Sequence, residues 1–402
     1  MRVLQVFNEY RQRGGEAIWV DTLSSLVGDA IELYDLRFRS DDWMGPKAPS
    51  KFRQMCWLGD NPSSRQRLRE AVRLYQPEVL LYHNLIPVAS LGLYDEARRL
   101  GLPVVQYIHN FRPFSASGYL WVNGQVNDAA LRGNPWPEIL TGAWNGSRLK
   151  TAVLAWHLAR LRRSGALDAV KLWLAISEFM RDQFIAAGIP SERIVTLRHC
   201  WEAGPPPSNV EEADYYLFLG RLCPEKGVHT LLETWQVLEH QLGPKCPRLV
   251  IAGQGPMEND VIQAAGKSNC IEYAGFVDGE RKHKLLARCR ALVAPSIWWE
   301  PLGLIVYEAY AAARPVLAAR SGGLSETVTG GVTGFLHEPG NSEQLARDVE
   351  RMENLKENGR GQMGCDGRRW LLQHASSNAW RERLIAIVRR VARGQHAAPE
   401  VA

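Results

Sequence analysis

The stretch W-W-E-P-L-G-L-I-V-Y-E-A-Y-A-A-A-R-P-V, residues 298–316, decides how the second half of this chain folds. The Pro301-Leu302-Gly303 turn ends a loop that follows the apolar run 291–294, and the apolar run from Leu304 predicts a helix. Another apolar run, 316–318, comes next, so the order is strand, helix, strand. The free backbone N–H groups at the start of such a helix favour an anion, for which a diphosphate is a candidate.

Two glutamates flank the start of this helix, with seven residues between them in the quoted stretch. Glu300 stands just before the helix and can accept hydrogen bonds from sugar hydroxyls. Glu308 lies more than two turns later and reaches a ribose only if it faces the same cleft. Taken alone, two solvated carboxylates beside a buried helix are the simpler interpretation, because charged residues normally lie in water. The segments around them change that balance.

The remainder of the chain alternates short apolar runs with helical patterns. In the first half we predict strands at 3–7, 79–82, 104–108, 172–175 and 194–197, and helices at 17–26, 91–100 and 177–187. In the second half we predict strands at 216–219, 249–252, 271–274, 291–294 and 316–318, and helices at 227–240, 258–265, 278–288 and 304–312. Continuous apolar strands are typical of parallel sheets buried on both faces. The pattern predicts an α/β protein with two Rossmann-like, doubly wound domains facing each other across a cleft, with ligands at the carboxyl ends of the strands.

The domain boundary is indicated by E-A-G-P-P-P-S-N at 202–209, where consecutive prolines can continue neither a helix nor a central strand. We therefore predict the following division: an N-terminal domain over 1–203, a Pro-rich linker over 204–209, a C-terminal domain over 210–375, and a terminal helix within 376–402 that packs back on the first domain.

Composition excludes several classes of protein. The 402 residues are 46% hydrophobic and 23% charged, which is typical of globular domains with cores of their own. Seven scattered cysteines without a Cys-x-x-Cys pair indicate neither a disulfide framework nor a zinc site, and a reducing, cytoplasmic compartment is expected. No apolar run is long enough to span a bilayer. The formal charge of +5 comes without any nucleic-acid-binding motif, so no nucleic-acid partner is expected.

A pair of cations follows a strand in L-F-L-G-R-L-C-P-E-K-G, residues 217–227. Arg221 and Lys226 lie five residues apart on a turn and can together grip a diphosphate. Fixed positive groups there stabilise the charge that builds on a leaving phosphate in the transition state. Considered by themselves, two exposed surface cations would be the ordinary interpretation.

The segment 148–163, R-L-K-T-A-V-L-A-W-H-L-A-R-L-R-R, combines basic residues with Trp156 and several leucines. It has the character of a helix that lies on a membrane surface, so peripheral contact with the inner face of the membrane is one interpretation. A helix packed on the core with a solvated basic end is the other, since the same apolar stripe serves both.

Taken in order, six segments resemble family 4 glycosyltransferases of the GT-B fold. They are G-R-L-C-P-E-K-G, L-V-I-A-G-Q-G-P-M-E, Y-A-G-F-V-D, A-P-S-I-W-W-E-P-L-G-L-I-V-Y-E-A, S-G-G-L-S-E and G-V-T-G-F-L. The likeness is strongest over 216–340. It extends more weakly to the first domain through Gly14-Gly15-Glu16, His109 and I-S-E-F-M-R-D-Q-F at 176–184.

This resemblance implies a retaining transferase, of hexosyltransferase type, that uses a nucleoside-diphosphate sugar as donor and a glycan or lipid-linked glycan as acceptor, in bacterial surface polysaccharide synthesis. Carried over by position, the catalytic group is His109, Arg221, Lys226 and Glu300. The donor-binding group is Gly15, Gly275, Phe276, Val277, Gly303, Leu304 and Glu308. Arg221 and Lys226 would bind the diphosphate, Glu300 the sugar hydroxyls, Glu308 the ribose, and Gly275-Phe276-Val277 the base. Gly15 would let the backbone approach the phosphate or acceptor closely.

His109 ends the predicted strand 104–108, and its imidazole could donate to a donor hydroxyl. A structural histidine is the alternative from the bare residue. No Asp-x-Asp pair that would chelate a divalent cation is present, so we expect metal-independent transfer with no cofactor, in which the departing phosphate helps to take the acceptor proton.

Two departures from the family pattern stand out. Ala313 occupies the usual glycine position before Arg314-Pro315, which suggests a helix end without a left-handed glycine cap. R-H-C-W-E-A-G replaces the usual Asn-Gly-Val-Asp segment at the domain junction.

Competing functions are a nucleotide-sugar hydrolysing epimerase, a phosphorylase, or a non-catalytic nucleotide-sugar-binding module. A dinucleotide-dependent oxidoreductase is disfavoured, because V-F-N-E-Y-R-Q-R-G-G lacks G-x-G-x-x-G spacing.

Overall fold

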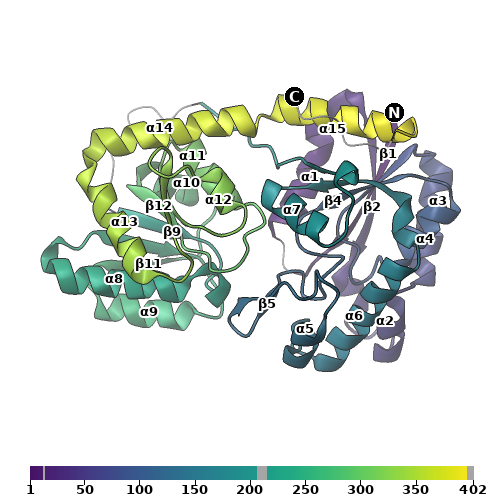
Figure 1. Cartoon of the computed structure of the whole chain (residues 1–402), viewed down its shortest axis with the longest axis horizontal. Helices are drawn as coiled ribbons and strands as arrows, with labels where there is room; N and C mark the ends of the chain where they lie inside the picture. Colours follow the sequence, from purple (N-terminus) through teal and green to yellow (C-terminus); the bar gives the residue numbers. More distant parts are fainter. Residues whose placement is uncertain (12–13, 206–214, 396–402) are drawn as a thin grey trace. The chain divides into compact units, whose positions relative to one another are not determined.

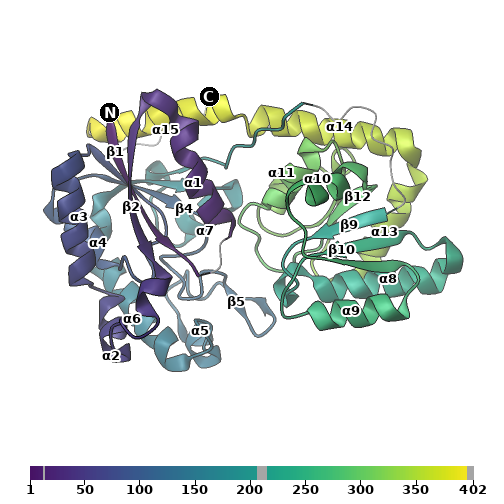
Figure 2. The same cartoon turned by 180° about the vertical axis from the view of Figure 1, so that it is seen from behind.

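The computed structural model describes residues 1–11, 14–205 and 215–395. The chain divides into two compact units, the first comprising Met1–Asn123, Asn127–His199 and Ser377–Ala402, and the second Gly124–Val126 and Cys200–Ser376. Each unit contains a six-stranded sheet, and helices flank each sheet (Figures 1 and 2). Most of the predicted linker 204–209 lies outside the described residues.

The first unit is a parallel sheet with strand order β2-β1-β3-β4-β7-β8. Its strands are β1 (Arg2–Glu9), β2 (Glu32–Arg39), β3 (Val79–Tyr82), β4 (Val104–Ile108), β7 (Val170–Ala175) and β8 (Ile194–Thr196). Its helices are α1 (Gly15–Val27), α2 (Lys51–Trp57), α3 (Pro62–Tyr75), α4 (Gly92–Arg99), α5 (Trp136–Thr141), α6 (Arg148–Arg163), α7 (Glu178–Ala186) and α15 (Ser377–Ala392). A separate two-stranded sheet pairs β5 (Trp121–Val122) with β6 (Gln125–Val126).

The second unit repeats the architecture with strand order β11-β10-β9-β12-β13-β14, again all parallel. Its strands are β9 (Tyr215–Leu219), β10 (Arg248–Ala252), β11 (Ile271–Gly275), β12 (Ala291–Ala294), β13 (Val316–Ala319) and β14 (Gly334–His337). Its helices are α8 (Val228–Leu242), α9 (Glu258–Lys267), α10 (Gly279–Arg288), α11 (Leu304–Ala311), α12 (Leu324–Thr327), α13 (Ser342–Asn354) and α14 (Lys356–His374). In both views α8 and α9 cover one face of this sheet, and α10 and α11 the other (Figures 1 and 2).

Continuous apolar runs form the central strands, as predicted for sheets covered on both faces. All residues of β3, β4, β9, β12 and β13 are buried. The α/β class and the two Rossmann-like units that the sequence predicts are thus confirmed. The edge strand β2 was not predicted, because E-L-Y-D-L-R-F-R carries charges and is mostly exposed or half-buried.

The C-terminal helix α15 belongs to the first unit. The Trp380 indole donates a hydrogen bond to the Tyr107 hydroxyl at 3.2 Å, and Arg383 donates to the Thr196 carbonyl at 3.2 Å. Trp380 also packs edge-on against Trp19 of α1. These contacts fix α15 on the sheet that contains β1.

Helix α11 ends in an unexpected backbone conformation. The sequence predicted an end without a left-handed glycine cap, yet Ala313 itself adopts the left-handed conformation with φ of 52°. The Ala313 amide donates to the Tyr310 carbonyl, and the Arg314 amide donates to the Ala309 carbonyl. An alanine therefore makes the turn that glycine makes at less steric cost.

Across the described ranges 1–11, 14–205 and 215–395, no helix combines the length and apolarity needed to cross a bilayer.

Candidate functional site

The second unit collects its chemistry at the point where the strand order reverses. Strands β9 and β12 are neighbours, yet their chain connections lead to opposite sides of the sheet. In doubly wound sheets a crevice opens at this point, outside the carboxyl ends of the strands. Arg221 and Lys226 follow β9, and Glu300 follows β12, so the three predicted residues come from adjacent strand ends. We call Arg221, Lys226, Glu300 and Glu308 the second-unit site.

An ion pair joins the two loops of the second-unit site. The Lys226 ammonium lies 2.6 Å from Glu300 Oε2, and both side chains are largely buried. The same oxygen accepts hydrogen bonds from the Trp298 indole at 3.0 Å and from the Ser296 hydroxyl at 3.1 Å. Lys226 also lies over the Trp298 ring, 5.2 Å from its centroid. The loop before α11 is thereby held against the turn after β9.

The charge on Glu300 is stabilised in place. Burial raises the pKa of this carboxyl, but the Lys226 ammonium and the Trp298 and Ser296 hydrogen bonds outweigh burial and hold the pKa below its usual value. Glu300 Oε1 accepts no hydrogen bond from any residue in the described part of the chain. An ionised carboxylate with one tethered and one available oxygen is suited to accept from a sugar hydroxyl.

Glycines allow the backbone around Glu300 to pack this closely. Gly322 has φ of 55°, and a Cβ atom there would lie 2.2 Å from the Glu300 carbonyl oxygen. The next residue, Gly323, donates its amide to that carbonyl at 2.7 Å. Gly303 precedes α11 in the left-handed conformation, with φ of 83°, and Leu304 is the first residue of the helix. The S-G-G segment that the sequence singled out therefore supports the loop that carries Glu300.

The other predicted residues of the second unit lie around this core. Arg221 is more than half exposed and makes a 3.5 Å contact with Glu225. Glu308, on α11, forms an ion pair with Lys282 of α10 at 2.9 Å. Sequence reasoning missed Lys282, because only packing of α10 beside α11 brings the two together.

The predicted base-contacting segment ends β11, the edge strand of the second sheet. Gly275 is the last residue of the strand and has φ of 70°. Phe276 leaves 60% of its surface exposed, while Val277 is buried. An exposed ring on a fixed turn offers an apolar face to a flat ligand.

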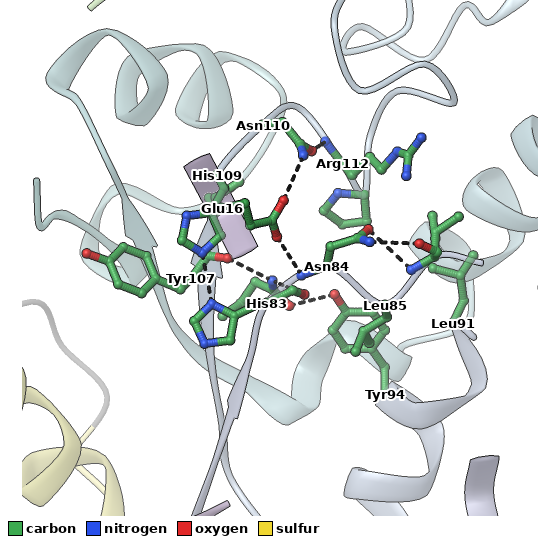
Figure 3. A pocket seen from close by; sticks show the side chains of 14 residues that line it. Glu16, His83, Asn84, Leu85, Leu91, Tyr94, Tyr107, His109, Asn110 and Arg112 are labelled. Carbon is green, nitrogen blue, oxygen red and sulfur yellow. Dashed lines mark hydrogen bonds between the residues drawn. The ribbon is translucent and has the colours of Figure 1, made fainter. Parts of the chain in front are cut away.

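The first unit contains a small pocket. It lies at the carboxyl ends of β1, β3 and β4, and Figure 3 shows the side chains that line it. Its polar lining includes Glu16 at the start of α1, His83 and Asn84 after β3, and His109, Asn110 and Arg112 after β4. We call these six residues the first-unit pocket.

Three histidines form a continuous hydrogen-bonded chain beside this pocket. His83 Nδ1 lies 2.8 Å from His109 Nε2, and His109 Nδ1 lies 3.1 Å from His199 Nε2. At the other end, His83 Nε2 lies 3.1 Å from the Gln5 side-chain oxygen. Gln5 uses its amide nitrogen to donate to the Asp35 carboxylate at 2.6 Å.

This chain has a single consistent assignment of protons. The Gln5 oxygen can only accept, so His83 carries its proton on Nε2 and accepts at Nδ1. His109 then donates from Nε2 and accepts at Nδ1, which makes His199 a donor from Nε2. Both ring nitrogens of His109 are thus engaged by other histidines. The histidine is where the sequence placed it, at the end of β4, but neither nitrogen is free to bond a ligand in this arrangement.

Burial keeps the three histidines of this hydrogen-bonded chain uncharged and makes Glu16 harder to ionise. It lowers the pKa of His109 to about 3 and lowers the pKa values of His83 and His199 well below the usual value. It raises the pKa of Glu16 to about 7, against the Asn84 amide and the Arg112 guanidinium, which lower it. The first-unit pocket therefore combines neutral histidine and asparagine side chains with the Arg112 guanidinium and with one carboxyl that titrates near neutral pH.

Sequence reasoning located part of this pocket. Gly15 begins α1 beside Glu16, as expected for the turn after the first strand. His83 and Asn110 were missed, although His83 directly follows the predicted strand 79–82 and Asn110 lies two residues after the predicted strand 104–108. His199 was missed because the chain of histidines forms only in the folded sheet.

Comparisons with known proteins agree with this architecture. The profile described as Glycosyltransferase Family 4 matches residues 45–200, and the profile described as Glycosyl transferases group 1 matches residues 204–370. The chain is 28% identical to the alpha-D-kanosaminyltransferase of Streptomyces kanamyceticus over 270 residues, which are 66% of this chain and 64% of that protein. It is 27% identical to the O-antigen chain mannosyltransferase B of Escherichia coli over 201 residues, 46% of this chain and 52% of the relative.

Among solved structures, HepE of Anabaena, determined in complex with UDP, aligns with a TM-score of 0.67 at 16% identity. The alignment covers 97% of this chain and 100% of HepE, which shows a shared fold. With two consecutive family profiles over most of its length, the chain belongs to the family 4 glycosyltransferases and has their two-domain GT-B fold. The chain spans between half and two thirds of the lengths of the two curated relatives named above.

Proposed function

We propose that the protein is a retaining, hexosyltransferase-type enzyme that moves a sugar from a nucleoside-diphosphate sugar to a glycan or lipid-linked glycan. The observation that carries this proposal is the Lys226–Glu300 pair, 2.6 Å apart at the strand-order reversal of the second unit. It places a cation for a phosphate beside a carboxylate oxygen that is available for a sugar hydroxyl.

Each predicted donor contact has a physical basis in the second unit. The Lys226 ammonium has three N–H donors, so it can keep Glu300 and still bind a phosphate oxygen. Arg221, exposed on the same turn, adds a second cation for the diphosphate. Glu308 would hold the ribose after exchanging part of its contact with Lys282, and the exposed Phe276 ring would cover the base. HepE complexes with UDP and UDP-glucose make uridine nucleotides the first donors to test.

The transfer that we propose is a substitution on one face of the sugar. The bond from the anomeric carbon to the departing phosphate oxygen breaks, and the bond to the acceptor oxygen forms on the same face. The acceptor proton passes to the departing phosphate, so that no protein nucleophile is needed. Arg221 and Lys226 would neutralise the phosphate charge, and we expect activity to persist with a chelator present. The anomeric configuration of the product, read from proton coupling constants, checks retention.

Acceptor and pathway are proposed on separate grounds. The relative named as an O-antigen chain mannosyltransferase supports a place in bacterial surface polysaccharide synthesis. A position at the inner face of the membrane is proposed from α6 instead. Within α6, Leu154, Leu158 and Leu161 pack into the core, which accounts for one apolar stripe. Leu149 and Trp156 are 64% and 58% exposed instead, beside basic residues of the same helix. These two residues support peripheral contact with an anionic bilayer.

Donor binding and turnover test the main proposal. UDP- and GDP-sugars should stabilise the protein in thermal-shift assays, by about 2.7 kcal/mol at a hundred times the dissociation constant. Product analysis with and without acceptor separates the alternatives. Release of free sugar with an inverted centre would indicate a hydrolysing epimerase, consumption of inorganic phosphate a phosphorylase, and binding without sugar release a non-catalytic module.

For the membrane contact, Leu149→Ser with Trp156→Ser should reduce sedimentation with phosphatidylglycerol vesicles, and the exposed Leu74→Ser on α3 is the matched control.

A further inference from the structure

We propose that Glu16 and Asn110 form a binding pair for a sugar hydroxyl in the first-unit pocket. The proposal rests on the proposed function, since it takes a sugar as ligand. It assigns a role to a carboxylate that the donor chemistry of the second unit does not use. Figure 3 shows the two side chains turned toward each other at the pocket.

The two groups are only loosely bonded to each other. Asn110 Nδ2 lies 3.5 Å from Glu16 Oε2 and 3.4 Å from the Tyr10 hydroxyl, both at the limit of a hydrogen bond. The opposite ends of both side chains are fixed more firmly. Glu16 Oε1 accepts from the Asn84 amide at 3.1 Å, and Asn110 Oδ1 accepts from the Arg112 amide at 3.0 Å. The pair is thus held in place while its facing atoms keep bonding capacity.

A hydroxyl group matches this pair chemically. A carboxylate oxygen only accepts hydrogen bonds, and an amide NH₂ only donates them. A sugar hydroxyl does both, so it can donate to Glu16 Oε2 and accept from Asn110 Nδ2 at the same time. A phosphate cannot donate to the carboxylate and would be repelled by it when ionised. The pair therefore selects a neutral polyhydroxyl ligand over an anion.

The fold gives this pair a position suited to a ligand. Glu16 lies in the first turn of α1, where the helix dipole favours a carboxylate. Asn110 follows β4, and Asn84 follows β3, so loops from three strand ends converge on one carboxyl group. The neighbouring Arg112 has a buried Nε–H without a partner among the residues described, which leaves a further donor unsatisfied at the pocket. Buried polar groups normally have partners, so this shortage indicates a missing polar ligand.

Affinity for the hydroxyl should depend on pH through Glu16. Burial raises its pKa to about 7, and the groups that face it are Arg112, Tyr10, His83 and His109. Burial keeps both histidines neutral in this range and raises the pKa of the Tyr10 phenol, so Glu16 alone titrates near pH 7. A carboxylate accepts a hydrogen bond more strongly than a carboxylic acid does. Sugar binding should therefore strengthen between pH 6 and pH 8.

Saturation-transfer NMR with methyl α-glucoside, α-galactoside and α-mannoside tests the pair directly, with and without UDP. We expect transfer to at least one glycoside in the wild type, and a fall of about fivefold or more in Glu16→Ala and Asn110→Ala. Glu16→Gln keeps the shape of the side chain, should lose the pH dependence, and guards against misfolding of the alanine variants. The exposed Glu70→Gln of α3 is the matched control and should behave as wild type.

The outcomes separate this proposal from the proposed function. The hydroxyl pair would be overturned if the NMR saturation transfer were unchanged in all three variants. It would also be overturned if the wild type showed no saturation transfer to any glycoside. A wild type that binds neither UDP nor GDP would instead contradict the proposed function. If the variants lose saturation transfer to the glucose protons of UDP-glucose but keep saturation transfer to the methyl glycosides, the pair binds the donor sugar. If they lose the methyl glycosides alone, the pair binds the acceptor.

Discussion

The second-unit site and the first-unit pocket occupy equivalent places in two similar sheets, yet their electrostatics are opposite. In the second-unit site two carboxylates are held in ion pairs, Glu300 with Lys226 and Glu308 with Lys282. In the first unit burial holds the histidines neutral and raises the pKa of Glu16 to about 7. One fold therefore supports one site built on close ion pairs and another in which neutral histidines lie beside a carboxyl that burial makes harder to ionise.

The difference follows from how each site compensates for burial. Removing a carboxylate from water is costly, and Glu300 is compensated by an ammonium and two further donors. Glu16 has only the Asn84 amide, a distant Asn110 amide and the nearby Arg112, which do not offset burial. A site of the first kind, with cations that can bind phosphate, suits a diphosphate, and a site of the second kind, with a carboxyl and an amide that face each other, suits a sugar hydroxyl.

The largest effect is expected from Lys226→Ala, which removes the charge on which the second-unit site depends. Donor turnover should fall at least about 100-fold, or about 2.7 kcal/mol, because the phosphate loses a cation and Glu300 loses its counter-charge. UDP release from UDP-sugars measures this. Lys284→Ala on α10, an exposed lysine paired with Glu280, is the control. Turnover within threefold of wild type would break the assignment.

A smaller effect, on stability, is expected from Glu16→Gln. This change removes a negative charge, whereas Lys226→Ala removes a positive one. The folded-state pKa of Glu16 lies above its unfolded value, so the native protein binds the extra proton between about pH 4.5 and 7. The free energy of unfolding therefore falls as pH rises through this window, and glutamine removes that loss. We expect the variant to gain about 2 °C in Tm over wild type at pH 8, about 1 kcal/mol, and nothing at pH 4. Melting curves at the two pH values measure it.

Glu300→Gln should change the pH dependence of stability in the opposite direction to Glu16→Gln. The folded-state pKa of Glu300 is depressed, so its contribution to stability is present above the unfolded pKa and is lost as pH falls through the folded pKa. The variant should melt below wild type at pH 8, and the difference should shrink in acid. Equal pH profiles for the Glu16 and Glu300 variants would contradict the contrast between the two sites.

Ala313→Gly tests a backbone position outside both sites. Its left-handed φ of 52° costs an alanine more than a glycine, so the change should stabilise the second unit by about 0.5 kcal/mol. The neighbouring Ala312 has φ of −83°, where glycine brings no relief, and Ala312→Gly should destabilise instead. Urea unfolding of the two variants measures both changes in the free energy of unfolding. A loss of stability in Ala313→Gly would show that the backbone at Ala313 is not strained.

The smallest expected effect concerns the histidine chain, in which no histidine should titrate. His83, His109 and His199 should remain neutral between pH 5 and 8, with the proton on Nε2 in each ring. Long-range ¹⁵N NMR distinguishes the two tautomers and the charged form. His240, at the end of α8, serves as an internal comparison because it lies on the surface of the second unit. A charged His109 at pH 6 would show that burial does not keep the histidine chain neutral.

The sequence predicted the central strands well because both faces of each sheet are covered, and this leaves apolar runs that are easy to identify. It missed β2 because an edge strand tolerates the charges of Glu32, Asp35 and Arg37. It missed β14, G-F-L-H, because four residues with a glycine give little pattern to detect.

The predicted site residues followed the order of motifs, and the structure puts Lys226 and Glu300 together as that order suggested. Their partners could not be predicted. Lys282 meets Glu308 only through packing of α10 beside α11, and His199 meets His109 across 90 residues of chain. Such pairs are set by sheet order, which spacing along a sequence does not specify.

The central claim is that the second unit binds a nucleoside diphosphate through Lys226 and its neighbours. Isothermal titration of the wild type and of Lys226→Ala with UDP and GDP tests it most directly. We predict saturable binding of at least one nucleotide by the wild type, weakened at least about tenfold in Lys226→Ala and unchanged in Lys284→Ala. Equal affinity in wild type and Lys226→Ala would contradict the account.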